Sequence, residues 1–532
     1  MQRRNLLAAT GGLALSGLSG AARSQTPEQV LRVGMTTSDV PTTGGIPDNG
    51  SEGGRFAGYT IYDALVNWDF TRTDQFADLT PGLATAWRID PANHLRWIFT
   101  LRQGVRFHDG SLLTADDILW NFDRHQNDKA PHYDRAQAVS YSNYTSAVKR
   151  WEKISDTEVA LYTAQPFSML PYLLSRVFIV SPRQYAAVGN WQDFKLKPSG
   201  TGPFKVVRVT PRTSIELARN EDYWDRTRVP KLARMILSPV PDALTRAAAL
   251  QAGQLDFIEY PAPDTLAALK AAGYQIVTKP YPHIWAWHAS NAEGFALHDR
   301  RVRQALNYAL DRESMVGLLA GTAIPARGPW PDTSAYFGKP GEHYRYDPDK
   351  ARALLKAAGY GPDRKLTIKV QVPTSGSGNM VPLPMAEFVQ QNFAEFGVVV
   401  DYEVSDWGTV LTAMRQRPDM PGPHRDVINH GLPISDPTQL FLNFSGQAFP
   451  PAGSNWSLYA NPEVDTLLAK AFETFEPTAR DALISQAHAR IVDDAPWVFM
   501  VHDLNPRALS PKVKNFRQAQ SWYQDFTQLY IG

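Results

Sequence analysis

Residues 95–110 read LRWIFTLRQGVRFHDG, and this stretch decides the fold class. Aromatic and β-branched residues alternate with polar ones over 95–101, which predicts a strand. Residues 104–110 predict a second short strand that ends in an Asp-Gly turn. Thr114 then precedes two acidic residues, which is typical of a helix that begins with Thr as its N-cap. The stretch therefore predicts strands followed closely by a helix.

The same alternation extends in both directions along the chain. Extended runs and amphipathic helical stripes follow one another, and no repeat of fixed period is visible. Further strands are predicted at 31–35, 204–209, 366–372 and 398–404, and further helices at 299–311, 349–358, 462–475 and 478–493. This order indicates an α/β protein built as several lobes.

Composition excludes several classes of protein. The chain has 532 residues, with 54 Lys+Arg against 53 Asp+Glu and a formal net charge of +1. A nucleic-acid-binding protein needs a basic surplus that this balance does not supply. The number of Cys is 0, which rules out disulfides, thiolate metal ligands and Cys nucleophiles. A hydrophobic fraction of 43% suits a large globular protein with a sizeable core.

The first 24 residues have the pattern of an export signal. Arg3 and Arg4 precede a weakly apolar stretch that is rich in Gly, Ala and Ser and ends in the small-x-small pattern Ala22-Arg23-Ser24. The arginine pair resembles a twin-arginine signal, so we expect residues 1–24 to be a signal peptide of that type. Without Cys no lipid anchor can be attached at a lipobox, and we expect a free protein in the periplasm.

Catalytic and metal-binding motifs are absent from the sequence. It contains no Gly-x-Ser-x-Gly elbow, no Walker-type phosphate loop and no His-Glu-x-x-His. His283 and His288 lie five residues apart on an extended segment, which places their rings on opposite faces and disfavours one shared metal ion. We therefore expect no enzyme activity, no cofactor and no metal site.

Several motifs resemble one known family over almost the whole chain after the signal. The motifs are Pro81 to Trp87, Trp97 to Gly110, Gly200 to Phe204, Asn220 to Trp224, Asp299 to Arg312, Tyr346 to Pro348 and Asp494 to Pro496. They resemble those of the family 5 solute-binding proteins of ABC importers, the dipeptide-, oligopeptide- and nickel-binding group. Most of these motifs are expected to be structural, including the turn at 107–110.

The resemblance implies a type II-like periplasmic binding protein fold, with two lobes, a hinge and an extra α/β domain in the N-terminal lobe. We expect lobe I from residues 25–51, 186–286 and 503–532, the extra domain from 52–185 and lobe II from 287–502. The extended runs 281–291 and 497–502 are expected to be the two hinge crossings. By resemblance, a solute trapped between the lobes stabilises the closed form, which is presented to the ABC permease subunits of the inner membrane. We expect a monomer.

The resemblance implies the fold and the transport role more clearly than the identity of the solute. In peptide-binding members an Asp just before an Asp-Pro-like step pairs with the α-ammonium group of the peptide. Here the matching position, three residues before Asp436, is Pro433. Asp436 or Asp39 could replace the missing acid.

Aromatic residues supply the remaining candidates for ligand contact. His430 falls where dipeptide binders carry a pocket aromatic residue, and Trp407 matches a tryptophan near the cleft of the family. Trp287 lies in the same aromatic-rich run as the two histidines at 283 and 288. For Trp407, packing in the core is the alternative.

The leading hypothesis is a binding protein for a peptide or peptide-like solute, such as a modified peptide, an opine or another amphiphilic small molecule. One alternative keeps the fold and changes the ligand to a chelated metal of the nickel type or a sugar. A chelated metal would engage His430 or another histidine of the cleft. A second is an extracytoplasmic hydrolase, and a third is a periplasmic chaperone that binds extended chains.

Overall fold

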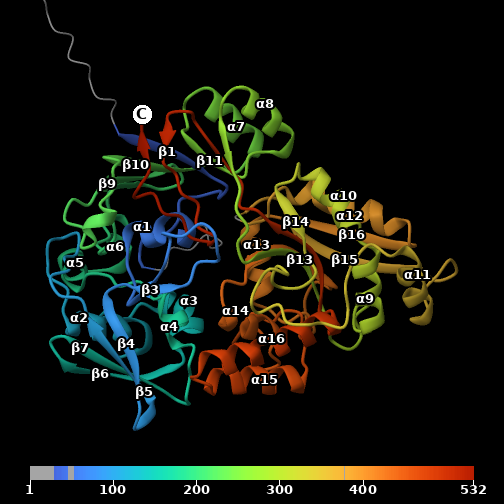
Figure 1. Cartoon of the computed structure of the whole chain (residues 1–532), viewed down its shortest axis with the longest axis horizontal. Coiled ribbons are helices and arrows are strands. Elements are labelled where there is room, and N and C mark those ends of the chain that lie inside the picture. The colour runs from blue at the N-terminus through green and yellow to red at the C-terminus, as the bar shows by residue number, and fades with distance from the viewer. Residues whose placement is uncertain (1–28, 46–52, 377) are drawn as a thin grey trace, which may run out of the picture.

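The computed structural model describes residues 29–45, 53–376 and 378–532. Strands and helices alternate along these ranges, and most of the strands belong to three sheets that lie in separate parts of the molecule (Figure 1). This confirms the α/β prediction. The expected signal peptide, 1–24, lies outside the described residues. Across those that are described, no helix combines the length and the apolar character needed to span a bilayer.

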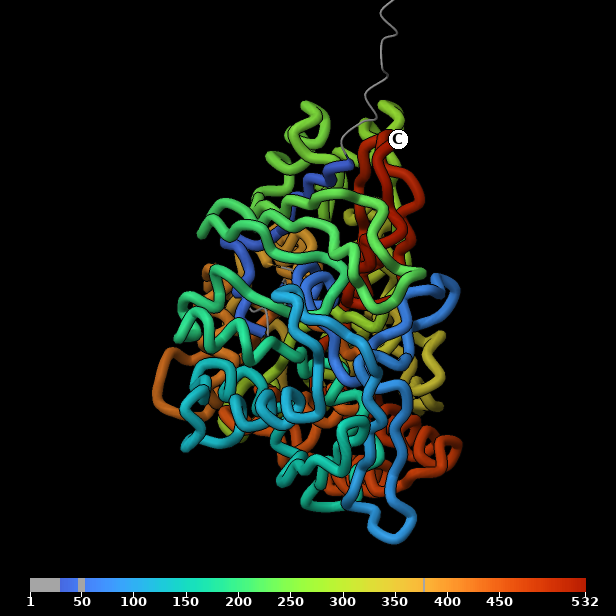
Figure 2. Tube along the Cα trace, turned by 90° about the vertical axis from the view of Figure 1, so that its left-hand side faces the viewer, coloured from blue at the N-terminus to red at the C-terminus, as the bar shows by residue number. Residues whose placement is uncertain are grey.

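The first sheet has seven strands and mixed directions. Its central strand, β1 (Val30–Met35), pairs in parallel with both β10 (Arg234–Pro239) and β11 (Phe257–Glu259). In spatial order the sheet contains β12 (Gln275–Val277), β19 (Arg507–Leu509), β11, β1, β10, β9 (Ser214–Arg219) and β8 (Phe204–Thr210). The strand β19 comes from the C-terminal end of the chain, so the two ends of the described chain meet in this sheet. Figure 2 shows the C-terminal residues beside it, where Gln29 donates a hydrogen bond to the carbonyl oxygen of Ile531 at 2.6 Å.

The second sheet has six strands and contains the most buried part of the molecule. All seven residues of its strand β13 (His283–Ala289) are buried, because helices cover both faces of the sheet. In spatial order the sheet contains β14 (Ala323–Pro325), β18 (Trp497–Asp503), β13, β17 (Val427–Pro433), β15 (Leu366–Pro373) and β16 (Val398–Ser405). Trp285, Trp287 and Trp497 belong to the hydrophobic core around it.

The third sheet is antiparallel and has four strands, β4 (Ala84–Asp90), β5 (Asn93–Leu101), β7 (Glu158–Thr163) and β6 (Val148–Ser155). The predicted strand at 95–101 is β5, and Thr114 caps the helix that follows, with Asp117 completing a capping box. The prediction of a second short strand at 104–110 is wrong. Those residues form a turn with a single β-bridge between Arg106 and Leu112.

Helices pack around each sheet. Those near the first and third sheets are α1 (Tyr59–Ile61), α2 (Ala115–Gln126), α3 (Arg135–Thr145), α4 (Leu170–Leu174), α5 (Pro182–Val188), α6 (Trp191–Leu196), α7 (Ala243–Gln251) and α8 (Leu266–Ala271). Those around the second sheet are α9 (Arg300–Ala309), α10 (Arg312–Leu318), α11 (Pro348–Ala357), α12 (Pro382–Ala394), α13 (Trp407–Met414), α14 (Pro437–Phe444), α15 (Pro462–Glu473) and α16 (Pro477–Asp494). The smaller strand pairs are β2 (Val66–Trp68) with β3 (Leu79–Pro81) and β20 (Val513–Lys514) with β21 (Tyr530–Ile531).

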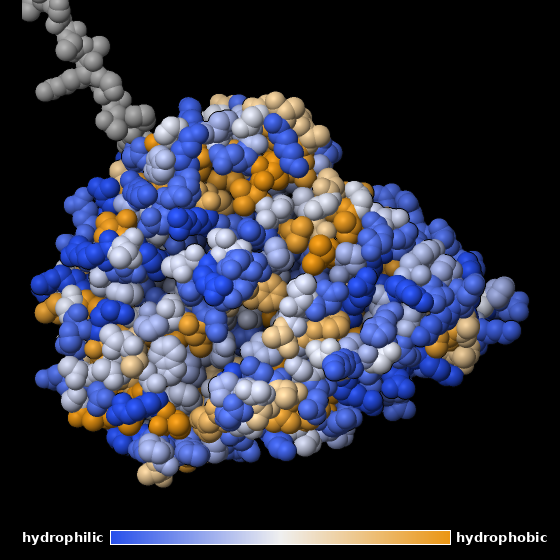
Figure 3. Space-filling model, in the orientation of Figure 1, coloured by the Kyte–Doolittle hydropathy of each residue, from blue (hydrophilic) through white to orange (hydrophobic). Residues whose placement is uncertain are grey.

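We use the names lobe I, lobe II and extra domain for the bodies around the first, second and third sheets. Each has its own hydrophobic core of buried side chains. The residue boundaries expected from the sequence stay a prediction. On the face seen in Figure 3, polar side chains cover most of the surface, and apolar ones gather in small groups such as the one around α7 and α8, where Leu244 is exposed.

The chain crosses between lobe I and lobe II twice, but not where we expected. Most of the run 281–291 and all of 497–502 lie inside the second sheet, in β13 and β18. The crossings are the adjoining segments 278–282 and 504–506, which connect β12 to β13 and β18 to β19. They are joined to each other, because Lys279 N–H donates to the carbonyl oxygen of Leu504 at 2.7 Å. The sequence pattern identified buried strands but did not separate them from the linkers beside them.

One buried carboxylate, Asp503, organises both crossings. Its side chain is fully buried and accepts hydrogen bonds from the hydroxyl groups of Tyr260 and Tyr281, the latter at 2.9 Å. Nδ1 of His283 lies 2.9 Å from the same oxygen, Oδ2. Burial acts to raise the pKa of Asp503, but His283, Tyr260 and Arg55 together hold that pKa below its usual value. The carboxylate is therefore charged and compensated inside the protein.

A second buried carboxylate, Asp63, explains two of the family-like motifs. It accepts hydrogen bonds from Thr201 Oγ1 at 2.9 Å, from the hydroxyl of Tyr223 at 3.1 Å and from the indole N–H of Trp224 at 2.9 Å. The turn at 107–110 contributes to the same region, since His108 N–H donates to the carbonyl oxygen of Gly200 at 2.8 Å. These motifs hold the extra domain against lobe I.

Gly202 occupies a place where backbone meets backbone. A Cβ atom there would lie 2.5 Å from the carbonyl carbon of Ile61 and 2.6 Å from the backbone nitrogen of Tyr62. Neither atom belongs to a side chain that could move aside, so any larger residue requires a shift of the main chain.

We expect Gly202→Ala to lower the free energy of unfolding by about 1–3 kcal/mol, the usual cost of overpacking. The measurement is urea denaturation followed by circular dichroism. Gly317→Ala is the matched control, because a Cβ at this helical position meets nothing within 4 Å. It should leave stability unchanged or raise it by up to about 1 kcal/mol. Equal stability of the two variants would contradict this reading of the turn.

Candidate functional site

A cavity lies between the lobes next to the hinge, and we call it the Arg176 cavity. Its volume is about 230 Å³. One wall comes from lobe I and the extra domain, and the opposite wall comes from lobe II. The first wall includes Tyr144, Arg176, Phe178, Trp522 and Tyr523, and the second includes Met414, His430, Leu432, Ser435, Gln439 and Asn443. A molecule held here touches both sides of the hinge.

A larger cavity of about 580 Å³ adjoins it, and we call it the Asp78 cavity. Ser435 lines both cavities, so they are two chambers of one cleft. Aromatic side chains line it from both sides, with Trp68, Phe76 and Tyr172 on one side and Trp330 and Tyr336 on the other. Carboxylates also line it, at Asp74, Asp78, Asp436 and Asp481, and none of its lining residues is Lys or Arg.

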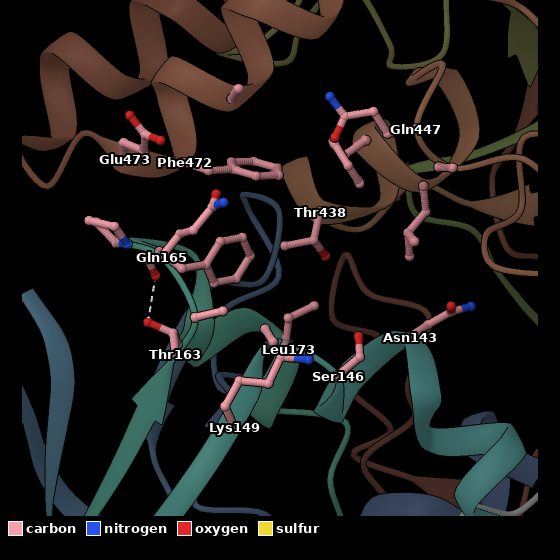
Figure 4. Close-up of a pocket in the computed structure, with 18 of the residues that line it drawn as sticks. Asn143, Ser146, Lys149, Thr163, Gln165, Leu173, Thr438, Gln447, Phe472 and Glu473 are labelled. Atoms are coloured by element: carbon pink, nitrogen blue, oxygen red, sulfur yellow. Dashed lines mark hydrogen bonds between the residues drawn. The ribbon is translucent and has the colours of Figure 1, made fainter.

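A third cavity lies farther along the same interface, between the extra domain and lobe II (Figure 4). Its volume is about 340 Å³. In Figure 4, Lys149, Ser146 and Asn143 come from the extra domain, whereas Phe472 and Glu473 come from the end of α15 on the opposite side. The two sides are joined beside it, because Ser168 N–H donates to the carbonyl oxygen of Phe472 at 2.6 Å.

Asp436, expected to bind a ligand ammonium group, is engaged by the protein itself. Its Oδ2 lies 2.6 Å from Nη2 of Arg176, and both side chains are buried. Its Oδ1 accepts from the backbone N–H and the hydroxyl of Thr438, and Asp436 is thereby the N-cap of α14. Burial acts to lower the pKa of Arg176, but the neighbouring Asp436 carboxylate outweighs it and raises that pKa. Both oxygens of Asp436 are therefore engaged by the protein, Oδ2 by Arg176 and Oδ1 by Thr438.

His430 lines the Arg176 cavity, as expected for a residue that contacts ligand. Its Nδ1 lies 3.1 Å from the carbonyl oxygen of Gly431. A carbonyl oxygen only accepts, so Nδ1 carries the hydrogen and Nε2 keeps a lone pair. The ring stacks on that of His288, with 4.0 Å between centroids. Burial lowers the pKa of His430 to about 4, so the imidazole is neutral near pH 7.

The other three expected residues lie in different surroundings. The ring of Trp407, half-buried at the start of α13, lies 6.0 Å from that of His430, so these two are neighbours. Trp287 is fully buried in the core of lobe II, where its ring meets Phe393 edge-on. Asp39 accepts hydrogen bonds from the backbone N–H groups of Val40 and Arg212 in lobe I. Trp287, Asp39 and Trp407 line none of the three cavities.

Sequence reasoning missed Arg176 and Asp78. Arg176 follows a short helix in the sequence SRVF, and Asp78 lies between Ala77 and Leu79. Neither position carries a local pattern that indicates a ligand site, because each acquires its role from a chain segment far away in sequence. Asp78 Oδ1 accepts hydrogen bonds from the hydroxyl of Tyr172 at 3.0 Å and from the N–H of Leu79 at 2.7 Å. No Lys or Arg of the described chain pairs with it.

The histidines at 283 and 288 do not come together. His283 lies beside Asp503 and stacks on Trp522, whereas His288 stacks on His430 and contacts Trp497. Within residues 29–45, 53–376 and 378–532, no group of three or more His, Cys, Asp or Glu side chains could hold a metal ion.

Comparisons with known proteins agree on one family. The model for the bacterial extracellular solute-binding proteins, family 5, matches residues 78–423, which is more than half of the chain. The heme-binding protein A of Haemophilus influenzae is 28% identical over 98% of this chain and 97% of its own length. The di/tripeptide-binding protein 2 of Pseudomonas aeruginosa is 27% identical over 89% of this chain and 91% of its own.

A solved structure gives the same result for the fold. The periplasmic binding protein DppA of Helicobacter pylori, in complex with the peptide STSA, superimposes with a TM-score of 0.80 at 24% identity. The match covers 94% of this chain and 98% of that protein. The expected type II-like architecture is confirmed.

The buried His430 makes stability depend on pH. In the unfolded chain its imidazole takes up a proton near pH 6.5, whereas in the folded protein it does so only near pH 4. The unfolded state therefore binds more protons in this window, and the free energy of unfolding falls as the pH drops from about 6.5 to about 4. We expect His430→Gln to make the free energy of unfolding less dependent on pH in this window. The decrease in slope is at most about 1.4 kcal/mol per pH unit, the contribution of one titrating group, and urea unfolding at several pH values measures it. His343→Gln, which replaces an exposed histidine, should keep the wild-type slope; an unchanged slope in His430→Gln would contradict the assignment.

Proposed function

The chain belongs to the bacterial extracellular solute-binding proteins of family 5, and we propose that it captures a peptide or peptide-like solute between its two lobes for an ABC importer. The closed form would be delivered to permease subunits in the inner membrane. We place the protein in the periplasm, as a monomer that binds its solute without reacting on it. Relatives named for heme and for di- and tripeptides indicate how widely solutes vary within this family.

The cleft next to the hinge is the observation that carries this proposal. Its two chambers are walled on one side by Trp522, Tyr523 and Tyr172, and on the other by His430 and Trp330. Most sites for small molecules are largely apolar hollows with a few placed polar groups. The Arg176 cavity fits that description, and the Asp78 cavity is more polar, with four carboxylates among its lining residues. A solute that contacts both walls makes more interactions in the closed state than in the open state, so binding shifts the population towards closure.

The charges of the two chambers differ and indicate the orientation of the solute. Arg176 is the one charged side chain among the residues lining its cavity, and Asp436 neutralises it. That chamber therefore suits an uncharged or aromatic group, for which the rings of Trp522 and Tyr523 offer stacking surfaces. In the other chamber Asp78 is exposed and has no ion-pair partner in the described chain, its Oδ1 accepts from the hydroxyl of Tyr172, and tyrosine and tryptophan rings line the same chamber. A carboxylate within an aromatic wall suits an ammonium group.

We therefore propose that the α-ammonium group of the solute binds Asp78, in place of the acid that Pro433 replaces. Tyr172 holds the carboxylate by its hydroxyl and leaves Oδ2 free to accept. This orientation places the uncharged part of the solute in the Arg176 cavity, beside His430, Trp522 and Tyr523. Asp39 is a second candidate for binding the ammonium group. Its support is weaker, because its carboxylate already accepts hydrogen bonds from backbone N–H groups of lobe I.

A chelated metal is the second candidate, and His430 is the observation that favours it. Its neutral ring keeps an Nε2 lone pair at the wall of the Arg176 cavity, which is the form of histidine that binds metals. One histidine does not make a complete metal site, so the metal would have to arrive with its own small-molecule ligands.

The decisive experiment is to purify the protein gently from its native host and record native mass spectra. A peptide-like mass that is released on unfolding supports the proposal. A metal isotope pattern in the released species would favour the second candidate, and recovery of a cleaved solute in place of the intact one would favour a hydrolase. Protein that never carries a solute, even when titrated calorimetrically with a dipeptide library, would overturn capture of peptides.

For the orientation of the solute we expect Asp78→Asn to weaken binding of the co-purified peptide-like solute by about 10- to 100-fold, because a charge-assisted hydrogen bond becomes a neutral one. Titration calorimetry gives the dissociation constant. Asp74→Asn is the matched control, since Asp74 lines the same cavity but is paired with Arg72 at the surface. Equal affinities of the two variants would exclude Asp78 as the ammonium partner.

A further inference from the structure

The ion pair between Arg176 and Asp436 joins the two sides of the cleft. Arg176 follows α4, on the side of lobe I and the extra domain, whereas Asp436 begins α14 in lobe II. They are 260 positions apart in sequence and 2.6 Å apart in space. Their side chains are only 9% and 1% exposed. The pair can exist only when the lobes are together.

Each partner is held in place by its own side of the cleft. Arg176 Nη1 donates to the carbonyl oxygen of Tyr172 at 3.1 Å, within the same segment. Asp436 accepts from the backbone N–H of Thr438 at 2.9 Å, which fixes the carboxylate at the start of α14. Little side-chain freedom is left to lose when the lobes approach, and this reduces the cost of forming the pair. A surface pair between two mobile side chains lacks that advantage.

The pair also lies on the wall between the two chambers rather than inside one of them. Arg176 lines one chamber, Asp436 lines the other, and Ser435 lines both. A solute can occupy either chamber while the pair is intact. The contact therefore does not require a solute and does not compete with one.

We propose that Arg176 and Asp436 form a latch that closes the lobes on each other before any solute is bound. This inference rests on the proposed function only in taking the lobes to open and close. The empty protein then spends part of its time closed, and a solute gains affinity because part of the closing free energy is already supplied. Both residues are positioning residues, and the binding contacts lie on either side of them.

The structure offers a matched control in the pair formed by Arg124 and Asp134. There too a buried arginine meets an aspartate that caps a helix, at 3.0 Å, with side chains 0% and 6% exposed. Both partners lie in the helices of the extra domain, so this pair does not cross the cleft. Asp134→Asn and Asp436→Asn make the same chemical change, and asparagine still caps a helix.

The test is single-molecule energy transfer on protein freed of solute by unfolding and refolding. Because the chain has no Cys, Ala92→Cys in the extra domain and Ala357→Cys in lobe II give two unique dye positions. We expect two distance populations for the parent protein. Asp436→Asn should lower the ratio of closed to open molecules by at least about tenfold, since loss of one member of a buried pair leaves the other charge unpaired in the closed state.

Arg176→Gln should have the same effect and provides a second variant if Asp436→Asn does not fold. Asp134→Asn should lower the melting temperature and leave the distance populations unchanged. Unchanged populations in both Asp436→Asn and Arg176→Gln would overturn the latch, and so would an equal shift in Asp134→Asn. No solute enters this measurement, so its failure would leave capture of a solute untouched, and a failure to find a solute would leave the latch untouched.

Discussion

The arrangement of the whole molecule depends on a charge buried between its lobes. Asp503 lies where the chain leaves the second sheet, and its carboxylate accepts from Tyr260 and Tyr281 while His283 lies beside it. An uncompensated carboxylate in such a place would cost several kcal/mol. Its partners come from β13, from the first crossing and from the end of β11, so compensating this one charge holds both crossings in register. Because the two crossings connect the lobes, their arrangement around Asp503 also sets how the two walls of the cleft face each other.

Local patterns in the sequence predicted the elements better than the places where they end. The strand at 95–101 and the helix capped by Thr114 follow from alternation and capping, which are properties of a few consecutive residues. The strand expected at 104–110 is absent because Phe107 and His108 make hydrogen bonds to a turn and to the loop at Gly200. The expected crossing at 281–291 merged the strand β13 with the linker before it, although Pro280 and Pro282 in that linker are a local sign that a strand does not extend through it.

The site was predictable only in part, because its residues meet across long stretches of sequence. His430 and Trp407 were identified through resemblance, and they do lie beside each other near the hinge. Asp436 was identified as an acid near the cleft, but its partner Arg176 is 260 residues away, and no sequence pattern connects them. Trp287 looks the same in sequence as a tryptophan that faces a ligand. Only the packing of α12 against the sheet places it beside Phe393 in the core.

The hydrogen bond between Lys279 and Leu504 makes the two crossings a short two-stranded ribbon. A single chain could bend and twist freely, whereas two chains held side by side bend easily across their common plane and resist twisting about their length. Two joined crossings restrict relative motion of the lobes more than two independent linkers would. Such a restriction favours one closed geometry, which is what the proposed pairing of Arg176 with Asp436 requires. Precision at the cleft is thus a property of the linkers as much as of the walls.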